Sequence, residues 1–293
     1  MFKRGIENQA FIDALKELFN DKNSFWYKIV NDNDLFIAIR DEYINVYYKG
    51  NSICKLSFNN GKLVNETHYK YLLNPNLSDI YVKAIDGTFE HQNSEMKFIP
   101  SLSDIDLIKT ASNPYSGEEK SGVHLMLKKW DDVIDTEIAF DDSSRIDLLK
   151  IEKKGNSELK LVFYEAKHFS NPEIRAQGQD EPKVINQLKR YEGTLKLHES
   201  EILESYKIVC RNKKDLEIVK NCNLIDGVLN NKLSIDFQPK LIIFGFDQDQ
   251  KDGRVWKQHK DKLQTILGDR LELKGNIQKS PPYARNIKSK DGH

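Results

Sequence analysis

The sequence contains little cysteine and no excess of either charge. Three cysteines, Cys54, Cys210 and Cys222, occur in 293 residues, and their wide spacing and odd number argue against a disulfide framework or a zinc knuckle. Such cysteine usage is typical of a reduced, cytoplasmic protein. Lysine plus arginine and aspartate plus glutamate number 45 each, so the formal net charge is zero. Binding to a polyanion would therefore require a local basic patch.

Long hydrophobic runs are also missing. No stretch approaches the roughly 18 consecutive apolar residues of a membrane-spanning helix, and the start, MFKRG, opens no apolar run. We therefore expect no membrane partner. The length suffices for one large domain or two ordinary ones, each with its own core.

The first hundred residues are rich in short β-type runs. Apolar residues at helical spacing predict an amphipathic helix over 8–20. Four runs follow at 35–40, 43–49, 52–58 and 62–73, separated by turn sequences such as KGN and NNG, and they predict an antiparallel meander. The tyrosines of these runs could stack nucleic-acid bases or simply pack the sheet, and the packing interpretation is favoured. These residues are Tyr43, Tyr47, Tyr48, Tyr69 and Tyr71.

The most informative stretch is LKLVFYEAK, residues 159–167. Its apolar run without a polar face predicts a central strand covered on both sides. Glu165 and Lys167 end this strand two residues apart, so they project from one face, where an unpaired charge would be costly. Other copies of E-x-K, such as 158–160 and 272–274, sit in polar surroundings and are read as surface.

A second strand, RIDLLKIE at 145–152, precedes this one, and the KKGNSE between them predicts a β-hairpin. Apolar residues alternate along this second strand, and Asp147 is the acidic residue among them. An odd loop such as 155–157 would place Asp147 opposite Glu165 on one face, whereas a two-residue loop at 155–156 would separate the two acids. A shared metal site requires the odd loop.

These residues resemble the PD-(D/E)XK, or restriction-endonuclease-like, nuclease superfamily. Its pattern is an acid on the second core strand, a hairpin, and then (D/E)-x-K closing the third strand, as in Asp147 and EAK at 165–167. RecB-like members add Q-x-x-x-Y on the next helix, matched here by Gln187 and Tyr191. The resemblance covers roughly 116–246, and Ile146 stands where the proline of the name would be.

The resemblance implies an α/β fold with a restriction-endonuclease-like core of helix, three-stranded meander, helix, strand and helix. We expect this nuclease domain over 106–293, preceded by a β-rich α+β domain over 1–105 for recognition or partner binding. The sequence places its elements at a helix from 117, a strand around 136–140, the hairpin, a helix opened by Pro182, a further helix toward 219, loops at 221–231, a strand at 241–246 and a helix at 254–267.

Hard oxygen ligands suit Mg²⁺ or Mn²⁺, which would act on a phosphodiester as a Lewis acid and lower the pKa of a bound water. The candidate metal ligands are Asp147, Glu165, the Ala166 carbonyl implied by the resemblance, and one upstream acid. That acid is Glu119, which helical phase favours over Glu118, or Glu137 on the strand before the hairpin. The resemblance assigns water orientation or charge stabilisation to Lys167, and support of the site and the DNA backbone to Gln187 and Tyr191.

The function expected is that of a metal-dependent nuclease acting on DNA, which by analogy fits restriction or anti-phage defence. Repair or recombination processing is equally compatible, and a nucleic-acid-binding or scaffold protein without turnover is the alternative from another class. The sequence leaves open DNA versus RNA, endonuclease versus exonuclease action, and whether two chains pair into a homo-oligomer.

Overall fold

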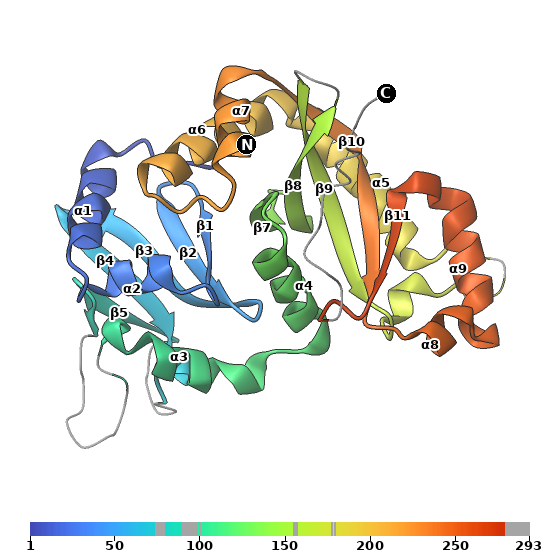
Figure 1. Cartoon of the computed structure of the whole chain (residues 1–293), viewed down its shortest axis with the longest axis horizontal. Helices are drawn as coiled ribbons and strands as arrows, with labels where there is room; N and C mark the ends of the chain where they lie inside the picture. The colour runs from blue at the N-terminus through green and yellow to red at the C-terminus, as the bar shows by residue number, and fades with distance from the viewer. Residues whose placement is uncertain are drawn as a thin grey trace, which may run out of the picture.

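A computed structural model describes residues 1–73, 80–89, 99, 101–154, 158–176, 178 and 180–278. It has a mixed α/β architecture with two sheets, and helix α4 lies between them (Figure 1). None of the helices in these described ranges is both long and apolar enough to cross a membrane.

The N-terminal part begins with two short helices and continues into an antiparallel sheet. The helix predicted over 8–20 is confirmed as α1, and the Asn8 side chain caps its start by accepting from the Phe11 backbone N–H. The strands follow one another in sequence order, which confirms the predicted meander. The elements are α1 Gln9–Asn20, α2 Phe25–Asn31, β1 Phe36–Ile39, β2 Tyr43–Tyr48, β3 Asn51–Asn59, β4 Lys62–His68, β5 Tyr81–Ile85 and β6 Thr88–Phe89.

One strand expected in this part is shorter than its sequence indicates. The run predicted over 62–73 leaves the sheet after His68 and forms a 3-10 turn, Tyr69–Leu72. The His68 ring accepts a hydrogen bond from the backbone of Lys70, and Leu73 adopts a left-handed conformation, φ 61°. These local contacts end the strand although its aromatic residues favour β structure.

The second sheet has five strands in the order β11-β10-β9-β8-β7. Strands β7, β8 and β9 are antiparallel, whereas β10 runs parallel to both β9 and β11. The hairpin is confirmed, and the three residues that connect its strands, 155–157, lie outside the described residues. The strands are β7 Val133–Ala139, β8 Arg145–Lys154, β9 Glu158–His168, β10 Lys232–Phe244 and β11 Leu271–Gly275.

Helices cover both faces of this sheet. The alternation of β9 directs Val162 and Tyr164 toward α4, and Leu161 and Phe163 toward α5, so the strand is buried on both faces as its apolar run predicts. The helices are α3 Ile105–Ser112, α4 Glu118–Lys129, α5 Lys183–Leu197, α6 Glu199–Asp215, α7 Cys222–Asn230, α8 Gln248–Asp252 and α9 Arg254–Leu267, with 3-10 turns at Leu102–Asp104, Asn113–Tyr115, Pro172–Ile174 and Gly268–Arg270.

Two expectations for the C-terminal part are wrong. Residues 221–231, expected as loops, contain α7, whose start is capped by the Asn221 side chain and whose Leu224 and Val228 are buried one turn apart. Strand β10 begins at Lys232 rather than near 241, and its register shifts between Asp236 and Lys240. Pro239 lies in this irregular stretch, where the lack of an N–H removes a ladder hydrogen bond.

Candidate active site

Three carboxylates lie at the same level on three neighbouring strands. The register of β8 with β9 pairs Leu148 with Tyr164, and its continuation by one residue sets Asp147 opposite Glu165. On the other side, β7 pairs with β8 at the residues that flank Glu137 and Asp147. The hairpin therefore has the register that a shared site requires.

Glu165 is buried and hydrogen-bonded at both oxygens. It is 2% exposed; Oε1 accepts from Gln187 Nε2 at 2.8 Å, and Oε2 accepts from the Tyr191 hydroxyl at 3.1 Å. The Lys167 ammonium lies 2.8 Å from Oε1. Burial raises the pKa of Glu165 above its usual range, although Lys167 opposes this shift.

Asp147 lies partly buried beside this acid. Its Oδ2 accepts a hydrogen bond from the Ala166 backbone N–H at 2.8 Å, which ties it to the neighbouring strand. Burial and the Glu165 charge raise the pKa of Asp147 well above its usual value. A cation bound between Asp147 and Glu165 would relieve the repulsion between their charges.

Lys167 is held between two acids. Its Nζ lies 2.8 Å from Glu165 Oε1 and 2.8 Å from Glu173 Oε2, and the residue is only 7% exposed. Burial opposes the charged form, but the Glu165 charge and these contacts outweigh it and raise the pKa of Lys167. The lysine is therefore a cation at neutral pH. Glu173 was not found from the sequence, because it lies in the loop after β9 and only the turn at Pro172–Ile174 brings it back.

Gln187 and Tyr191 lie one turn apart on α5 and face the same acid. Gln187 Nε2 donates to the Tyr191 hydroxyl oxygen at 2.6 Å as well as to Glu165. The Tyr191 hydroxyl, which has a single proton to donate, also lies within hydrogen-bond distance of the backbone carbonyl of Arg145, at the start of the strand that carries Asp147. Thus the structure brings together all five residues predicted to be catalytic.

The upstream acids are distributed around a cavity of about 210 Å³. Its lining includes Glu119, Glu137 and Asp147. Glu119 Oε2 accepts from the His168 backbone N–H at 3.1 Å and from Asn171 Nδ2 at 2.8 Å. Glu119 thus approaches the site from α4, and its hydrogen bonds tie the helix to the end of β9.

The two rivals of Glu119 have different surroundings. Glu137 forms an ion pair with Arg145 at 3.2 Å and adopts a left-handed backbone, φ 51°, which costs free energy in a non-glycine residue. Glu118 is exposed and lies near the ring of His168. Glu119 and Glu137 line the cavity of about 210 Å³ together with Asp147, and we call it the acid cavity. Glu118 does not line it.

The candidate metal ligands are carboxylate oxygens with a backbone carbonyl beside them, and hard divalent cations prefer such oxygen ligands. Within the described residues, however, no three Asp, Glu, His or Cys side chains are close enough together to hold an ion as they stand. Cation binding would require a side-chain rearrangement that brings Asp147, Glu165 and either Glu119 or Glu137 around one ion.

Comparison with known proteins adds no relative: no family model, curated protein or solved structure matches the chain.

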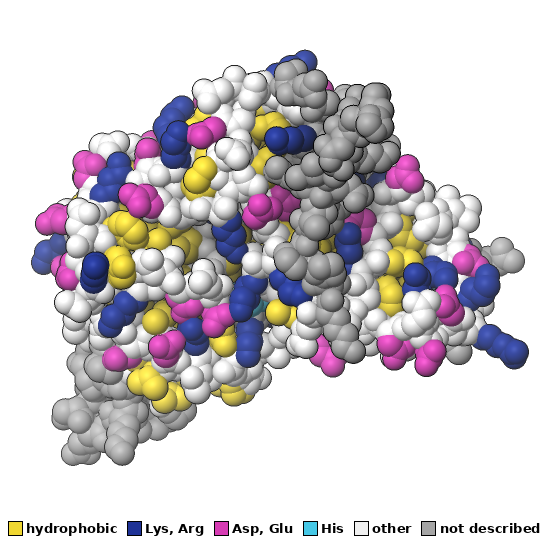
Figure 2. Space-filling view, in the orientation of Figure 1, with side chains coloured by type: hydrophobic (Ala, Val, Ile, Leu, Met, Phe, Trp, Pro, Cys, Tyr) yellow, Lys and Arg dark blue, Asp and Glu magenta, His cyan; other side chains and the backbone are white. Residues whose placement is uncertain are grey.

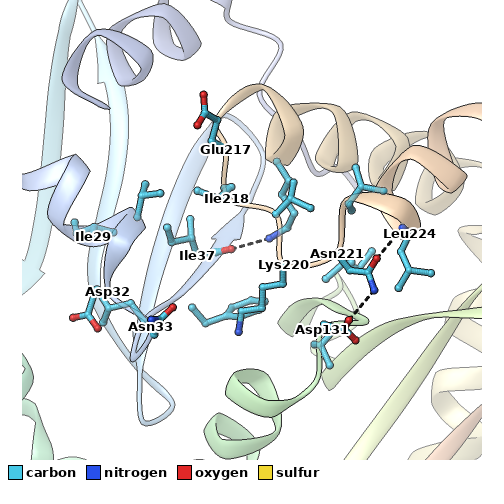
Figure 3. Close-up of a pocket in the computed structure, with 18 residues that line it drawn as sticks. Ile29, Asp32, Asn33, Ile37, Asp131, Glu217, Ile218, Lys220, Asn221 and Leu224 are labelled. Atoms are coloured by element: carbon cyan, nitrogen blue, oxygen red, sulfur yellow. Dashed lines mark hydrogen bonds between the residues drawn. The ribbon is translucent and has the colours of Figure 1, made fainter. Parts of the chain in front are cut away.

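A second cavity, of about 170 Å³, shares no lining residue with the acid cavity. Figure 3 shows the residues that line it, which include Asp32 and Asn33 of the α2–β1 connection and Glu217 and Lys220 of the α6–α7 connection. Lys213 of α6 also lines it, and its Nζ donates to the Ile37 carbonyl at 3.0 Å. Burial lowers the pKa of Lys213 to about 8.

The variant Lys213→Met is expected to be more stable than the wild type at pH 7. Below pH 8 the lysine is charged in both states, so its burial costs about 3 kcal/mol, less the hydrogen bond to Ile37. Between pH 8 and 10.5 the folded protein loses this proton before the unfolded chain does, so the advantage of the variant shrinks. Urea unfolding at pH 7 and 10 measures both effects. Lys214→Met, at the exposed neighbour, is the control, and a less stable Lys213→Met at pH 7 would contradict the prediction.

Proposed function

We propose that the chain is a divalent-metal-dependent nuclease of the PD-(D/E)XK type that hydrolyses phosphodiester bonds in DNA. The observation that carries the proposal is the set of acids on three adjacent strands, Glu137, Asp147 and Glu165, beside the buried cation of Lys167. The row lies at the end of β9, where residues 161–167 are all buried.

The order of elements supports the same proposal. Helix α4, strands β7 to β9, helix α5, strand β10 and helix α9 follow the succession that the resemblance implies. Helices α6 and α7 enter between α5 and β10, and β11 extends the sheet beyond that core. The intervening helices pack against the N-terminal part, so they do not interrupt the strands that carry the acids (Figure 1).

In this proposal each side chain has a distinct task. A Mg²⁺ or Mn²⁺ ion held by Asp147, Glu165 and the Ala166 carbonyl, with Glu119 or Glu137, would supply Lewis acidity and a water of lowered pKa. Lys167 keeps its proton, so it serves as a fixed positive charge for the phosphoryl oxygens rather than as a general base. Gln187 and Tyr191 orient Glu165 and are positioning residues.

Removing the Tyr191 hydroxyl is expected to weaken activity without abolishing it. Tyr191→Phe keeps the buried ring but removes the hydroxyl that contacts Glu165 Oε2 and the Arg145 carbonyl. Loss of a residue that orients a metal ligand typically lowers metal affinity or activity by about 10- to 100-fold. A titration of cleavage rate against Mn²⁺ measures the effect as a higher metal requirement. If the metal requirement and the maximal rate both match the wild type, Tyr191 does not position Glu165.

The direct test is incubation of the full chain with linear, circular and single-stranded DNA in Mg²⁺ or Mn²⁺, with a chelator as the control. Metal-dependent product from any substrate supports the proposal, and cleavage of the circle identifies an endonuclease. Absence of product from all three in both metals contradicts it.

A protein that binds nucleic acid without turnover is the second candidate. It is favoured by one observation: both oxygens of Glu165 already have protein partners, and Glu119 is engaged by backbone and amide donors. The incubation distinguishes the two, because this candidate binds DNA and releases no product.

A further inference from the structure

The N-terminal sheet presents a polar and aromatic face toward the candidate site. In β2, Ile44 and Val46 point into the core under α1 and α2, so the alternate residues, Tyr43, Asn45 and Tyr47, point to the opposite face. A groove of about 710 Å³ lies on this opposite face. Strand β7 and the start of α4 contribute its far wall through Glu137, Ala139 and Lys120.

Aromatic rings gather along one side of this groove. The His68 ring lies 5.7 Å from that of Tyr71 and 5.5 Å from that of Tyr81, between ring centroids. Tyr81 is 58% exposed, so packing within the sheet leaves most of its surface open. An exposed ring beside other rings is a surface on which an unpaired base can stack.

Basic side chains in the groove outnumber acidic ones, six to two. Lys55 and Arg145 are each paired with one of the acids, at 3.1 and 3.2 Å, and Arg40 and Arg4 lie 2.6 and 3.9 Å from the buried carboxylate of Asp135. Lys70 and Lys120 have no carboxylate partner in the described part of the chain, and the Lys70 ammonium lies over the Tyr71 ring at 5.0 Å. The basic residues are Arg4, Arg40, Lys55, Lys70, Lys120 and Arg145, and the acidic ones are Glu66 and Glu137.

This excess is local. Figure 2 shows basic and acidic side chains interspersed over the visible face of the molecule, which agrees with a formal charge of zero. A groove with unpaired cations in an otherwise balanced surface is where a polyanion would be attracted.

The groove continues into the acid cavity. Tyr47, Gly50, Lys120, Glu137 and Arg145 line both. Gly50 lies in the β2–β3 turn at φ +73°, and a Cβ there would approach the Lys120 Cβ to 2.6 Å. Glycine therefore allows this turn to contact α4 at the junction of groove and cavity.

We propose that this groove binds a single-stranded segment of nucleic acid and directs its backbone to the acids. Rings such as Tyr81 would stack unpaired bases, while Lys70 and Lys120 would contact phosphates. A duplex keeps its bases stacked inside and offers no base face to these rings. This inference rests on the proposed function, since it names the substrate of the same site.

The test is binding measured by fluorescence anisotropy in the presence of a chelator, so that it does not depend on cleavage. The probes are a labelled single-stranded DNA, an RNA of the same sequence, and the DNA duplex. We expect at least one single strand to bind more tightly than the duplex by about tenfold or more, and the two single-stranded probes show whether the sugar matters. Tighter binding of the duplex, or binding of none of the three, overturns the inference.

Variants connect that binding to the groove. Tyr81→Ala is expected to weaken single-strand binding by about fivefold or more, whereas Tyr81→Phe keeps the ring and the affinity. Lys70→Ala and Lys120→Ala should each reduce the slope of log affinity against log salt by about 0.7. Lys16→Ala, at an exposed position of α1, is the matched control. Unchanged affinity and slope in the groove variants would overturn the inference.

The two proposals can fail separately. If groove variants lose binding but no metal-dependent product forms, the groove assignment stands and the nuclease proposal falls. If cleavage requires Lys167 but substitutions of Tyr81, Lys70 and Lys120 leave the affinity for single strands unchanged, the nuclease proposal stands and the groove assignment falls.

Discussion

Replacing Lys167 by alanine is expected to lower the rate of metal-dependent DNA cleavage by about a hundred- to a thousandfold. Lys167 is the buried cation at the end of β9, and its contacts with Glu165 and Glu173 hold its proton in place. Without it, no fixed positive charge faces the phosphoryl oxygens, and two acids lose their partner. The measurement is initial cleavage rate at saturating Mn²⁺.

The same strand offers a matched control. Glu158 and Lys160 repeat the E-x-K spacing on β9, but Lys160 pairs with Asp236 on β10, 3.6 Å away, at the other end of the strand. Lys160→Ala should therefore cleave at the wild-type rate.

Folding and catalysis must be separated for this site. Asp147→Asn keeps the size of the side chain and an oxygen for the Ala166 N–H, and should also abolish cleavage because it removes a charged metal ligand. Thermal unfolding of each variant shows whether the fold persists. Wild-type cleavage by folded Lys167→Ala or Asp147→Asn would refute the site assignment.

Replacing Asp135 by alanine is expected to destabilise the protein by about 3–5 kcal/mol. Asp135 on β7 is 1% exposed and accepts from Arg40 at 2.6 Å and from the Tyr206 hydroxyl at 2.9 Å. Burial by itself would lower the pKa of Arg40, but the Asp135 charge outweighs it and raises that pKa. Removing the acid therefore leaves a buried guanidinium without its partner charge. Denaturant unfolding measures the loss.

A second pair of variants tests the physical reason. Arg40→Met combined with Asp135→Leu removes both charges and should recover much of the lost stability, because the penalty comes from one unpaired buried charge. Disruption of the more exposed pair Lys55–Glu66 should cost no more than about 1 kcal/mol. If Asp135→Ala costs no more than disruption of that pair, Arg40 and Asp135 do not stabilise the contact between β1 and β7.

The local signals in the sequence predict most of the elements that build the candidate site. The apolar run before Glu165 predicts a doubly covered strand, and Pro182 with the stripe of Val184, Leu188 and Tyr191 predicts α5. Helix α7 also carried a local signal, the Asn221 cap before apolar residues, and the expectation of loops there overlooked it. In each of these elements the signal lies in residues a few positions apart along the chain.

Contacts between distant segments were beyond reach of such patterns. Glu173 returns to Lys167 through a loop, and β11 adds a parallel strand after α9. Glu119 was expected near the site, but not its hydrogen bonds to the His168 backbone and Asn171. The groove combines β2 to β5 with α4 and β7, so its excess of basic residues cannot be recognised in any one segment.

The sequence alone thus determined the hairpin strands β8 and β9, the spacing of Glu165 and Lys167, and the helical phase of Gln187 and Tyr191, because these depend on backbone periodicity and on burial along one element. Only the tertiary structure decided the register that sets Asp147 opposite Glu165, the acid that holds Lys167 from the loop, and the groove between the two sheets. These features depend on how separate elements pack, and packing energy is summed over residues far apart in the chain.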